Sequence, residues 1–234
     1  MKVLVTGAAG FIGGQLWHKL WQRGDEVVGI DNFSYGNLDN LKFDDHDFGP
    51  EVRKMDIRDK AGMLQLFEEE KFEVVYNIAG IAPLPDCQSD PVQAIEVNTL
   101  GLVNLLEAGR RTGIRQLVQA STNAMYENET EFPTVEGKFN PPTLIYPNTK
   151  YCGERFAQSF ADATGFPLLS VIMIQVLGYS TPLLPYQASP IVVAMGLGKV
   201  PARAGMQLCL ALAAVSYLIL LPLDYAWYQL LGKL

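Results

Sequence analysis

Tyr146 and Lys150 are the side chains best suited to move a proton, because they stand four residues apart in the run YPNTK. Residues at this spacing share one face of a helix, so a phenol and an ammonium can address the same substrate atom. Lowering the pKa of a tyrosine from about 10 to about 7 requires about 4 kcal/mol. One ammonium about 4 Å away, at an effective dielectric constant near 20, supplies that amount. The pair predicts proton removal from a hydroxyl, with a chance pattern as the alternative.

A second group of residues could bind phosphate. Gly7, Gly10 and Gly13 follow an apolar, β-branched run and open a helical pattern. Glycines at this spacing let backbone N–H groups and the start of a helix approach a pyrophosphate. Asp31 ends the next apolar run, where a carboxylate can accept hydrogen bonds from an adenosine ribose and would repel a 2′-phosphate. These residues predict binding of NAD rather than NADP, and a glycine turn without a ligand is the alternative.

These residues must be positioned by an alternation of strands and helices. One apolar stripe, Leu16, Trp17, Leu20 and Trp21, has helical spacing and is expected to pack in the core. The alternation predicts an α/β fold with a doubly wound, mostly parallel sheet covered by helices on both faces. Strands are expected at 2–6, 26–30, 51–55, 73–78, 115–121 and 167–172, and helices at 11–23, 59–70, 91–112 and 148–164.

The distribution of charge and of metal-binding side chains excludes several functions. The chain has a net charge of −7, and residues 163–234 carry three basic groups and one acid, or +2, which leaves −9 on residues 1–162. An acidic front half argues against nucleic-acid binding. Three widely spaced cysteines and two histidines indicate neither a disulfide framework nor a metal site. The apolar start is broken at once by Thr6 and Gly7, so no signal peptide is expected and the front half should be cytoplasmic.

Several motifs in order resemble one family. TGAAGFIG (6–13), DNFSYGNLDNL (31–41), MDIRD (55–59), NIAG (77–80) and YPNTK (146–150) are similar to segments of the extended short-chain dehydrogenase/reductase family. The match is to its NAD-dependent epimerase/dehydratase branch, although many relatives have a histidine in place of Asn77. The resemblance covers residues 1 to about 171. It implies a Rossmann-type NAD-binding domain and isomerase or oxidoreductase chemistry on a nucleotide sugar.

The resemblance also assigns individual residues. STNAMYE (121–127) is similar to the Ser/Thr motif of the family, which implies that Thr122 is the catalytic hydroxyl beside Tyr146 and Lys150. Asn98 matches an asparagine that positions the lysine in relatives, with an ordinary polar helix residue as the alternative. The residues implied in cofactor binding are Gly7, Gly10, Phe11, Ile12, Gly13, Asp31, Asn32, Asp56, Ile57, Ala79, Gly80, Asn98, Tyr146 and Lys150.

Two further expectations follow from the resemblance. Sugar dehydratases of the family place an acid pair directly after the Ser/Thr, where this chain has Asn123 and Ala124. Dehydration is therefore disfavoured, which leaves epimerase or simple oxidoreductase chemistry. The segments 91–112 and 148–164 match the helices through which relatives dimerise, so a homodimer is expected.

The back half, residues 172–234, departs from this pattern. No Asp, Glu, Lys, Arg or His lies between Asp162 and Lys199, and the usual substrate-binding lobe is expected to be missing. The run 206–223 has no charged side chain and would span about 27 Å as a helix, close to the thickness of a bilayer core. It predicts a transmembrane helix, with the preceding Lys199 and Arg203 on the cytoplasmic side. A buried helix lacking partners is the alternative.

The tail also carries a second resemblance. LLPYQASPIVVAMGLGKV (183–200) and ILLPLDYAWYQLLG (219–232) resemble the end of a divalent-anion:sodium symporter family permease. One spanning helix cannot form an alternating-access transporter, so transport by this chain alone is not expected. The leading hypothesis is an NAD-dependent nucleotide-sugar epimerase or oxidoreductase domain associated with the membrane through its tail. The alternatives are a non-catalytic NAD-binding module, or a truncated or fused chain joined near residues 171–174.

Overall fold

The computed structural model describes residues 1–128, 140–165, 168–171 and 207. The chain divides into two units, Met1–Met173 and Ile174–Leu234. Within the described ranges, no helix is both long enough and apolar enough to cross a membrane. The predicted tail over 172–234, which includes the predicted transmembrane helix over 206–223, lies outside these ranges except for Gln207.

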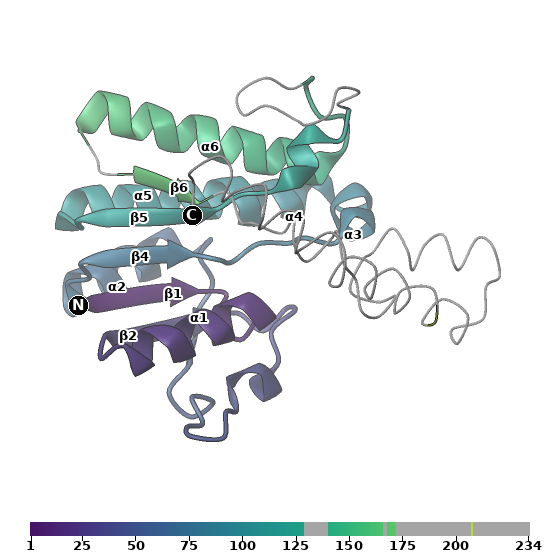
Figure 1. Ribbon diagram of the computed structural model, residues 1–234. Coiled ribbons are helices and arrows are strands. Elements are labelled where there is room, and N and C mark those ends of the chain that lie inside the picture. The colour runs from purple at the N-terminus through teal and green to yellow at the C-terminus, as the bar shows by residue number, and fades with distance from the viewer. Residues whose placement is uncertain (129–139, 166–167, 172–206, 208–234) are drawn as a thin grey trace, which may run out of the picture. The chain divides into compact units, whose positions relative to one another are not determined.

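A six-stranded sheet in which every neighbouring pair is parallel forms the centre of the first unit (Figure 1). The strand order is β3-β2-β1-β4-β5-β6, so the chain reverses its direction of winding between β1 and β4. The predicted doubly wound α/β fold is thereby confirmed. The strands are β1 (Lys2–Thr6), β2 (Glu26–Asp31), β3 (Arg53–Lys54), β4 (Val74–Asn77), β5 (Gln116–Ala120) and β6 (Leu168–Val171).

Helices cover both faces of this sheet, in agreement with the prediction. The segment expected as one helix over 91–112 is helical throughout but contains a π-helical turn, η2. The α-helices are α1 (Phe11–Gln22), α2 (Lys60–Glu70), α3 (Leu84–Ser89), α4 (Pro91–Ile95), α5 (Gly101–Thr112) and α6 (Ile145–Thr164). The π-helical turn η2 spans Glu96–Leu100, and the short 3₁₀ helices are η1 (Leu38–Leu41) and η3 (Asn123–Tyr126).

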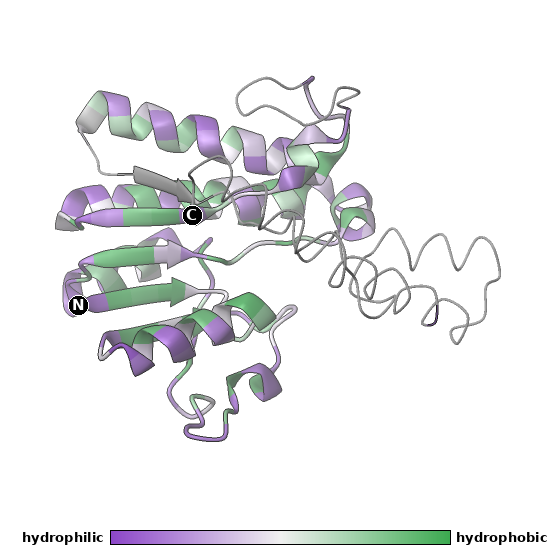
Figure 2. Ribbon diagram, in the orientation of Figure 1, coloured by the Kyte–Doolittle hydropathy of each residue, from purple (hydrophilic) through white to green (hydrophobic). Residues whose placement is uncertain are grey.

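Two apolar clusters hold these layers together. One joins the sheet to α2, α5 and α6 and includes Phe67, Leu105 and Leu117. The other joins the sheet to α1 and the segment after β2, and it includes Trp17 and Phe48. Figure 2 shows the consequence for hydropathy: β1 is hydrophobic along most of its length, whereas α1 alternates between hydrophobic and hydrophilic residues. Strands buried on both faces and helices buried on one face have these patterns.

The two tryptophans of α1 have different surroundings. Trp17 is 1% exposed and lies over Gly29 of β2, where a Cβ would come 1.9 Å from its ring. Trp21 is 38% exposed and stacks on His46 with ring centroids 4.9 Å apart. The expectation of core packing is confirmed for Trp17 and wrong for Trp21, because the segment after β2 covers only part of its ring.

Candidate cofactor cleft and proton-transfer site

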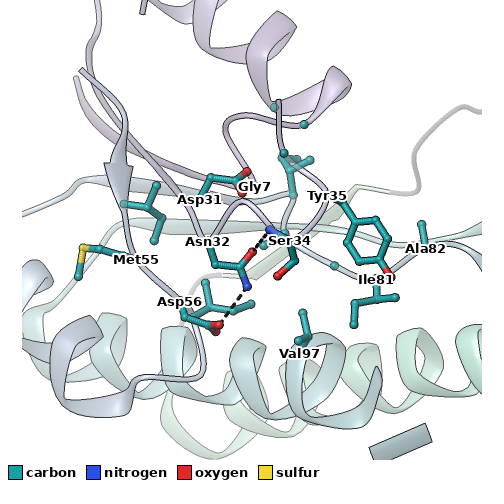
Figure 3. A pocket seen from close by; sticks show the side chains of 18 of the residues that line it. Gly7, Asp31, Asn32, Ser34, Tyr35, Met55, Asp56, Ile81, Ala82 and Val97 are labelled. Atoms are coloured by element: carbon teal, nitrogen blue, oxygen red, sulfur yellow. Dashed lines mark hydrogen bonds between the residues drawn. The ribbon is translucent and has the colours of Figure 1, made fainter. Parts of the chain in front are cut away.

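A cleft of about 310 Å³ lies at the carboxyl ends of β1, β2 and β4 (Figure 3). Ligands of open α/β sheets bind at the point where the strand order reverses, and this cleft occupies that point. Of the residues predicted to bind the cofactor, those in its lining are Gly7, Gly10, Phe11, Ile12, Gly13, Asp31, Asn32, Asp56, Ile57, Ala79 and Gly80. Lining residues that the sequence reasoning did not single out include Ser34, Tyr35, Arg58, Ile81 and Gln93.

The glycine turn is shaped for close backbone approach. Gly7 has a φ of 65°, in the left-handed region that favours glycine. A Cβ on Gly13 would lie only 2.0 Å from the carbonyl oxygen of Gly7. Helix α1 then begins at Phe11, and no side chain caps its first turn. N–H groups of an uncapped first turn, together with the helix dipole, favour an anion at this end of the cleft.

Asp31 is buried at the edge of the cleft and holds two segments of backbone. Its Oδ2 accepts a hydrogen bond from the N–H of Ala9 at 2.9 Å, and its Oδ1 accepts one from the N–H of Phe33 at 2.7 Å. A carboxylate oxygen can accept more than one hydrogen bond, so both oxygens keep acceptor capacity. The geometry therefore fits a carboxylate that binds a diol while it fixes the turn around it.

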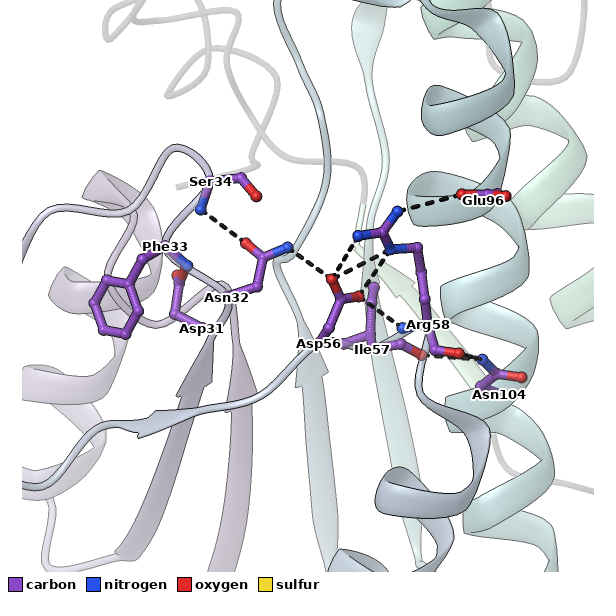
Figure 4. Close-up of polar contacts among 9 residues, drawn as sticks. All are labelled: Asp31, Asn32, Phe33, Ser34, Asp56, Ile57, Arg58, Glu96 and Asn104. Carbon is purple, nitrogen blue, oxygen red and sulfur yellow. Dashed lines mark hydrogen bonds and ion pairs between the residues drawn. The ribbon is translucent and has the colours of Figure 1, made fainter.

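A polar network surrounds the second predicted carboxylate, Asp56 (Figure 4). Nη2 of Arg58 donates to Oδ2 of Asp56 at 2.8 Å, and Nδ2 of Asn32 donates to the same oxygen at 3.0 Å. Hydrogen bonds from the Arg58 side chain, and then from Asn32, lower the pKa of Asp56 to about 2. Nη1 of Arg58 also donates to Glu96 at 3.2 Å. The network keeps Asp56 ionised and oriented at the wall of the cleft.

The side chains of Asn98 and Lys150 both lie next to Gly80. A Cβ on Gly80 would lie 3.0 Å from Oδ1 of Asn98 and 3.0 Å from Nζ of Lys150. Asn98 lies in the π-helical turn, where its side chain binds both backbone groups of Ile81 and its Nδ2 donates to Oγ1 of Thr149 at 3.0 Å. Such turns often occur at functional sites. Asn98 thus ties the wall of the cleft to the helix that carries Lys150.

Lys150 is a buried cation, with 6% of its surface exposed. Its Nζ donates to the carbonyl oxygen of Ala120, at the end of β5, at 3.3 Å. Burial lowers its pKa to about 8, and the nearby Cys87 and Glu154 oppose that change. In such buried surroundings the positive charge of the ammonium interacts strongly with any ionisable group beside it, because the local dielectric constant is low.

Thr122 directly precedes η3, and Tyr146 lies in α6, which packs against η3. Thr122 is 3% exposed, and its Oγ1 accepts a hydrogen bond from the N–H of Ala124 at 3.1 Å. Tyr146 is half-buried in the first turn of α6, which begins at Ile145, three residues before the expected start. Neither residue, nor Lys150 or Asn98, is among those that line the cleft.

One contact beside these residues was not anticipated. Oγ of Ser121 donates to Oε1 of Glu154, one turn after Lys150 on α6. Together with the bond from Lys150 to Ala120, it connects the end of β5 to α6 at two points. The predicted hydroxyl Thr122 follows directly, so these contacts set its position relative to the helix. The partners are 33 residues apart in the sequence, and no local pattern signals their pairing.

The buried ammonium makes a prediction about stability. Because the pKa of Lys150 falls from 10.5 to about 8, the unfolded chain binds more protons between these pH values, and stability rises with pH. Below pH 8 the charged group destabilises the fold by about 3 kcal/mol. We expect the stability advantage of Lys150→Met over wild type to shrink by about 2 to 3 kcal/mol between pH 7 and pH 10, measured by urea unfolding.

The exposed Lys54 provides the matched control for this experiment. Lys54→Met should show no pH-dependent difference from wild type. A constant difference between Lys150→Met and wild type across this pH range would contradict the buried-cation description.

The comparisons with known proteins agree with this geometry. Residues 3–197 match the model of the NAD dependent epimerase/dehydratase family. The chain is 35% identical to a UDP-glucose 4-epimerase of Mycolicibacterium smegmatis over 69% of its own length and 52% of the relative's. Among solved structures, it resembles the Thermotoga maritima UDP-glucose 4-epimerase with UDP-glucose, with a TM-score of 0.68, 30% identity and coverage of 74% of this chain and 55% of that one. It also resembles the Thermus thermophilus UDP-glucose 4-epimerase in complex with NAD, with a TM-score of 0.66, 36% identity and coverage of 74% of this chain and 54% of that one.

These matches also bear on the predicted tail. The family match continues to residue 197, past the junction predicted near residues 171–174. The matches do not support the resemblance of the tail to a permease. The chain spans about half the length of the curated relatives it matches.

Proposed function

The chain belongs to the NAD dependent epimerase/dehydratase family, and from that premise we propose that it binds NAD and catalyses the epimerisation of a nucleotide sugar. The observation that carries the proposal is the cleft at the reversal of strand order, which places the glycine turn, Asp31 and Asp56 around one space. A pyrophosphate between two nucleoside groups needs an anion site flanked by polar groups of this kind.

The residues of the cleft fit the parts of the cofactor. The first turn of α1 would bind the pyrophosphate, Asp31 the ribose of the adenosine, and Asp56 with Ile57 the adenine. At Gly13 a side chain would clash with the backbone of the turn, and at Gly80 it would crowd Asn98 and Lys150, so the shape of the cleft wall depends on these glycines. When bound, NAD supplies a hydride acceptor at its nicotinamide ring.

Proton transfer is assigned to Thr122, Tyr146 and Lys150. Tyr146 removes the proton from a sugar hydroxyl, and Thr122 hydrogen-bonds the same oxygen. The ammonium of Lys150, one helical turn from Tyr146, lowers the pKa of the phenol toward neutrality. With its own pKa at about 8, Lys150 is mainly charged at pH 7 and can serve in this role.

Epimerisation is favoured over dehydration because Asn123 and Ala124 supply no acid pair after Thr122. The relatives are named UDP-glucose and UDP-glucuronate 4-epimerases, which makes UDP-sugars the proposed substrates. These names do not favour the alternative of a non-catalytic NAD-binding module. Incubation of the full-length chain with UDP-glucose should yield UDP-galactose. NAD binding without turnover of UDP-glucose or UDP-glucuronate would contradict the proposal and favour the alternative.

We also propose a homodimer through the helical segments 91–112 and 148–164. Large apolar side chains are exposed there, with 66% of Val92, 50% of Ile95, 48% of Leu100 and 47% of Phe156 accessible. They lie on α4, η2 and α6, which contact one another, and apolar side chains exposed on neighbouring helices can form a protein contact. In sedimentation, Ile95→Glu should convert dimers to monomers, whereas Leu38→Glu, at an exposed apolar position on η1, should not. A wild-type chain that is monomeric at all concentrations would contradict the proposed homodimer.

The cellular location is also a proposal. The uncharged run 206–223 supports a tail that associates with membranes and leaves the NAD-binding domain in the cytoplasm. Deletion of residues 173–234 should then remove a requirement for detergent. A full-length chain that stays soluble and monodisperse without detergent would contradict the proposed anchor.

A further inference from the structure

The loop after β2 is joined to α3 across the cleft by one hydrogen bond. Tyr35 lines the cleft, and its hydroxyl donates to Oδ2 of Asp86 in α3 at 2.6 Å. Ile81 and Ala82, which lead into α3, also line the cleft. Figure 3 shows the ring of Tyr35 directed toward this side. The bond therefore links two borders of one cleft that are 51 residues apart in the sequence.

The base of this loop is held separately from the bond. The N–H of Phe33 donates to Asp31 at 2.7 Å, and the N–H of Ser34 donates to Asn32 at 2.9 Å. Phe33 has a φ of 63°, a conformation that few residues other than glycine adopt. Loss of the bond to Asp86 would thus free the side chain of Tyr35 and leave the base of the loop in place.

The hydrogen bond between Tyr35 and Asp86 should persist over a wide pH range. The hydrogen bond to Asp86, and secondarily burial, raise the pKa of Tyr35 to about 12. The phenol therefore stays protonated and donates throughout the pH range in which proteins function. A carboxylate acceptor makes the bond stronger than one between neutral groups. Because Tyr35 is 52% exposed, the contact lies at the solvent side of the cleft, where a ligand would enter and leave.

We propose that Tyr35 and Asp86 form a clasp that slows the release of a bound dinucleotide. Tyr35 contacts the cofactor, and Asp86 is a positioning residue that acts through Tyr35. The inference rests on the proposed binding of NAD. A dinucleotide that reaches from Asp31 to Gly80 passes between the loop after β2 and the segment before α3, so the clasp must open before it leaves.

The release of NADH from the full-length chain tests the clasp, followed by fluorescence after mixing with excess NAD. Tyr35→Phe and Asp86→Ala each should release NADH about five- to tenfold faster, as expected for loss of one hydrogen bond at a site partly open to solvent. Asp86→Asn is the graded comparison: its amide oxygen can still accept from the phenol but carries no charge, so it should release NADH faster than wild type and more slowly than Asp86→Ala. The double variant Tyr35→Phe/Asp86→Ala should be no faster than either single variant.

Tyr35 and Asp86 are both exposed, so thermal unfolding should confirm that the variants are folded. An unchanged release rate in Tyr35→Phe or in Asp86→Ala overturns the clasp, and so do effects that add in the double variant. A wild-type chain that binds no NADH overturns the proposed function together with the clasp. A wild-type chain that binds it, with variants that release it equally fast, overturns the clasp alone.

Discussion

Tyr146→Phe should lower the turnover of UDP-glucose by about 10²- to 10⁴-fold, the usual contribution of a positioned acid or base. The phenylalanine keeps the ring, which packs against the apolar cluster around α6, and removes only the hydroxyl. The affinity for NAD should change far less than turnover, because the glycine turn, Asp31 and Asp56 supply most of the proposed contacts with the cofactor. Steady-state kinetics and an NAD titration on the same preparation measure the two quantities.

Tyr151 offers a control for this substitution on the same helix. It is half-buried and lies five residues after Tyr146, so its side chain projects from another part of the helix surface. Tyr151→Phe should keep full turnover. Equal losses in the two variants would show that the effect comes from packing of α6, and the assignment of Tyr146 as the base would fail.

Gly13→Ala should have the second large effect, on cofactor affinity. The new Cβ would lie 2.0 Å from the carbonyl oxygen of Gly7, which is backbone and cannot move without opening the turn. We expect NAD affinity to fall at least about tenfold, with a loss of about 1 to 3 kcal/mol in the free energy of unfolding. Calorimetric titration and denaturant unfolding measure these changes.

Gly10→Ala provides a graded comparison, since a Cβ there would lie 3.1 Å from the same oxygen. Its effects on affinity and stability should be clearly smaller than those of Gly13→Ala. If Gly13→Ala binds NAD as tightly as wild type, the turn does not hold the pyrophosphate in the way proposed.

The parts of the fold that could be predicted are those set by local patterns. The first strand and the start of α1 agree with the expected 2–6 and 11–23, because apolar runs and the glycine spacing act within a few residues. The two-residue strand β3 falls short of the expected 51–55, since Arg53 and Lys54 at the sheet edge are both exposed. Helix α3 was missed because a six-residue segment containing Pro85 has too little periodicity to reveal a helix.

The parts of the site that could not be predicted depend on contacts between distant segments. The glycines and Asp31 were found because their spacing alone carries the chemistry. The hydrogen bond from Arg58 to Glu96 joins residues 38 apart, and the bond from Tyr35 to Asp86 joins residues 51 apart. The π-helical turn at Asn98 has a hydrophobic pattern close to that of an α-helix, so only the folded chain shows how it reaches Ile81.

Calorimetric titration of the full-length chain with NAD tests the central claim most directly, namely that the glycine turn, Asp31 and Asp56 form a dinucleotide site. The account predicts saturable binding of one NAD per chain and weaker binding of NADP, whose 2′-phosphate would meet the carboxylate of Asp31. Asp31→Ala should weaken the binding of NAD and reduce the preference over NADP. A folded chain that shows no saturable binding of NAD would contradict the account.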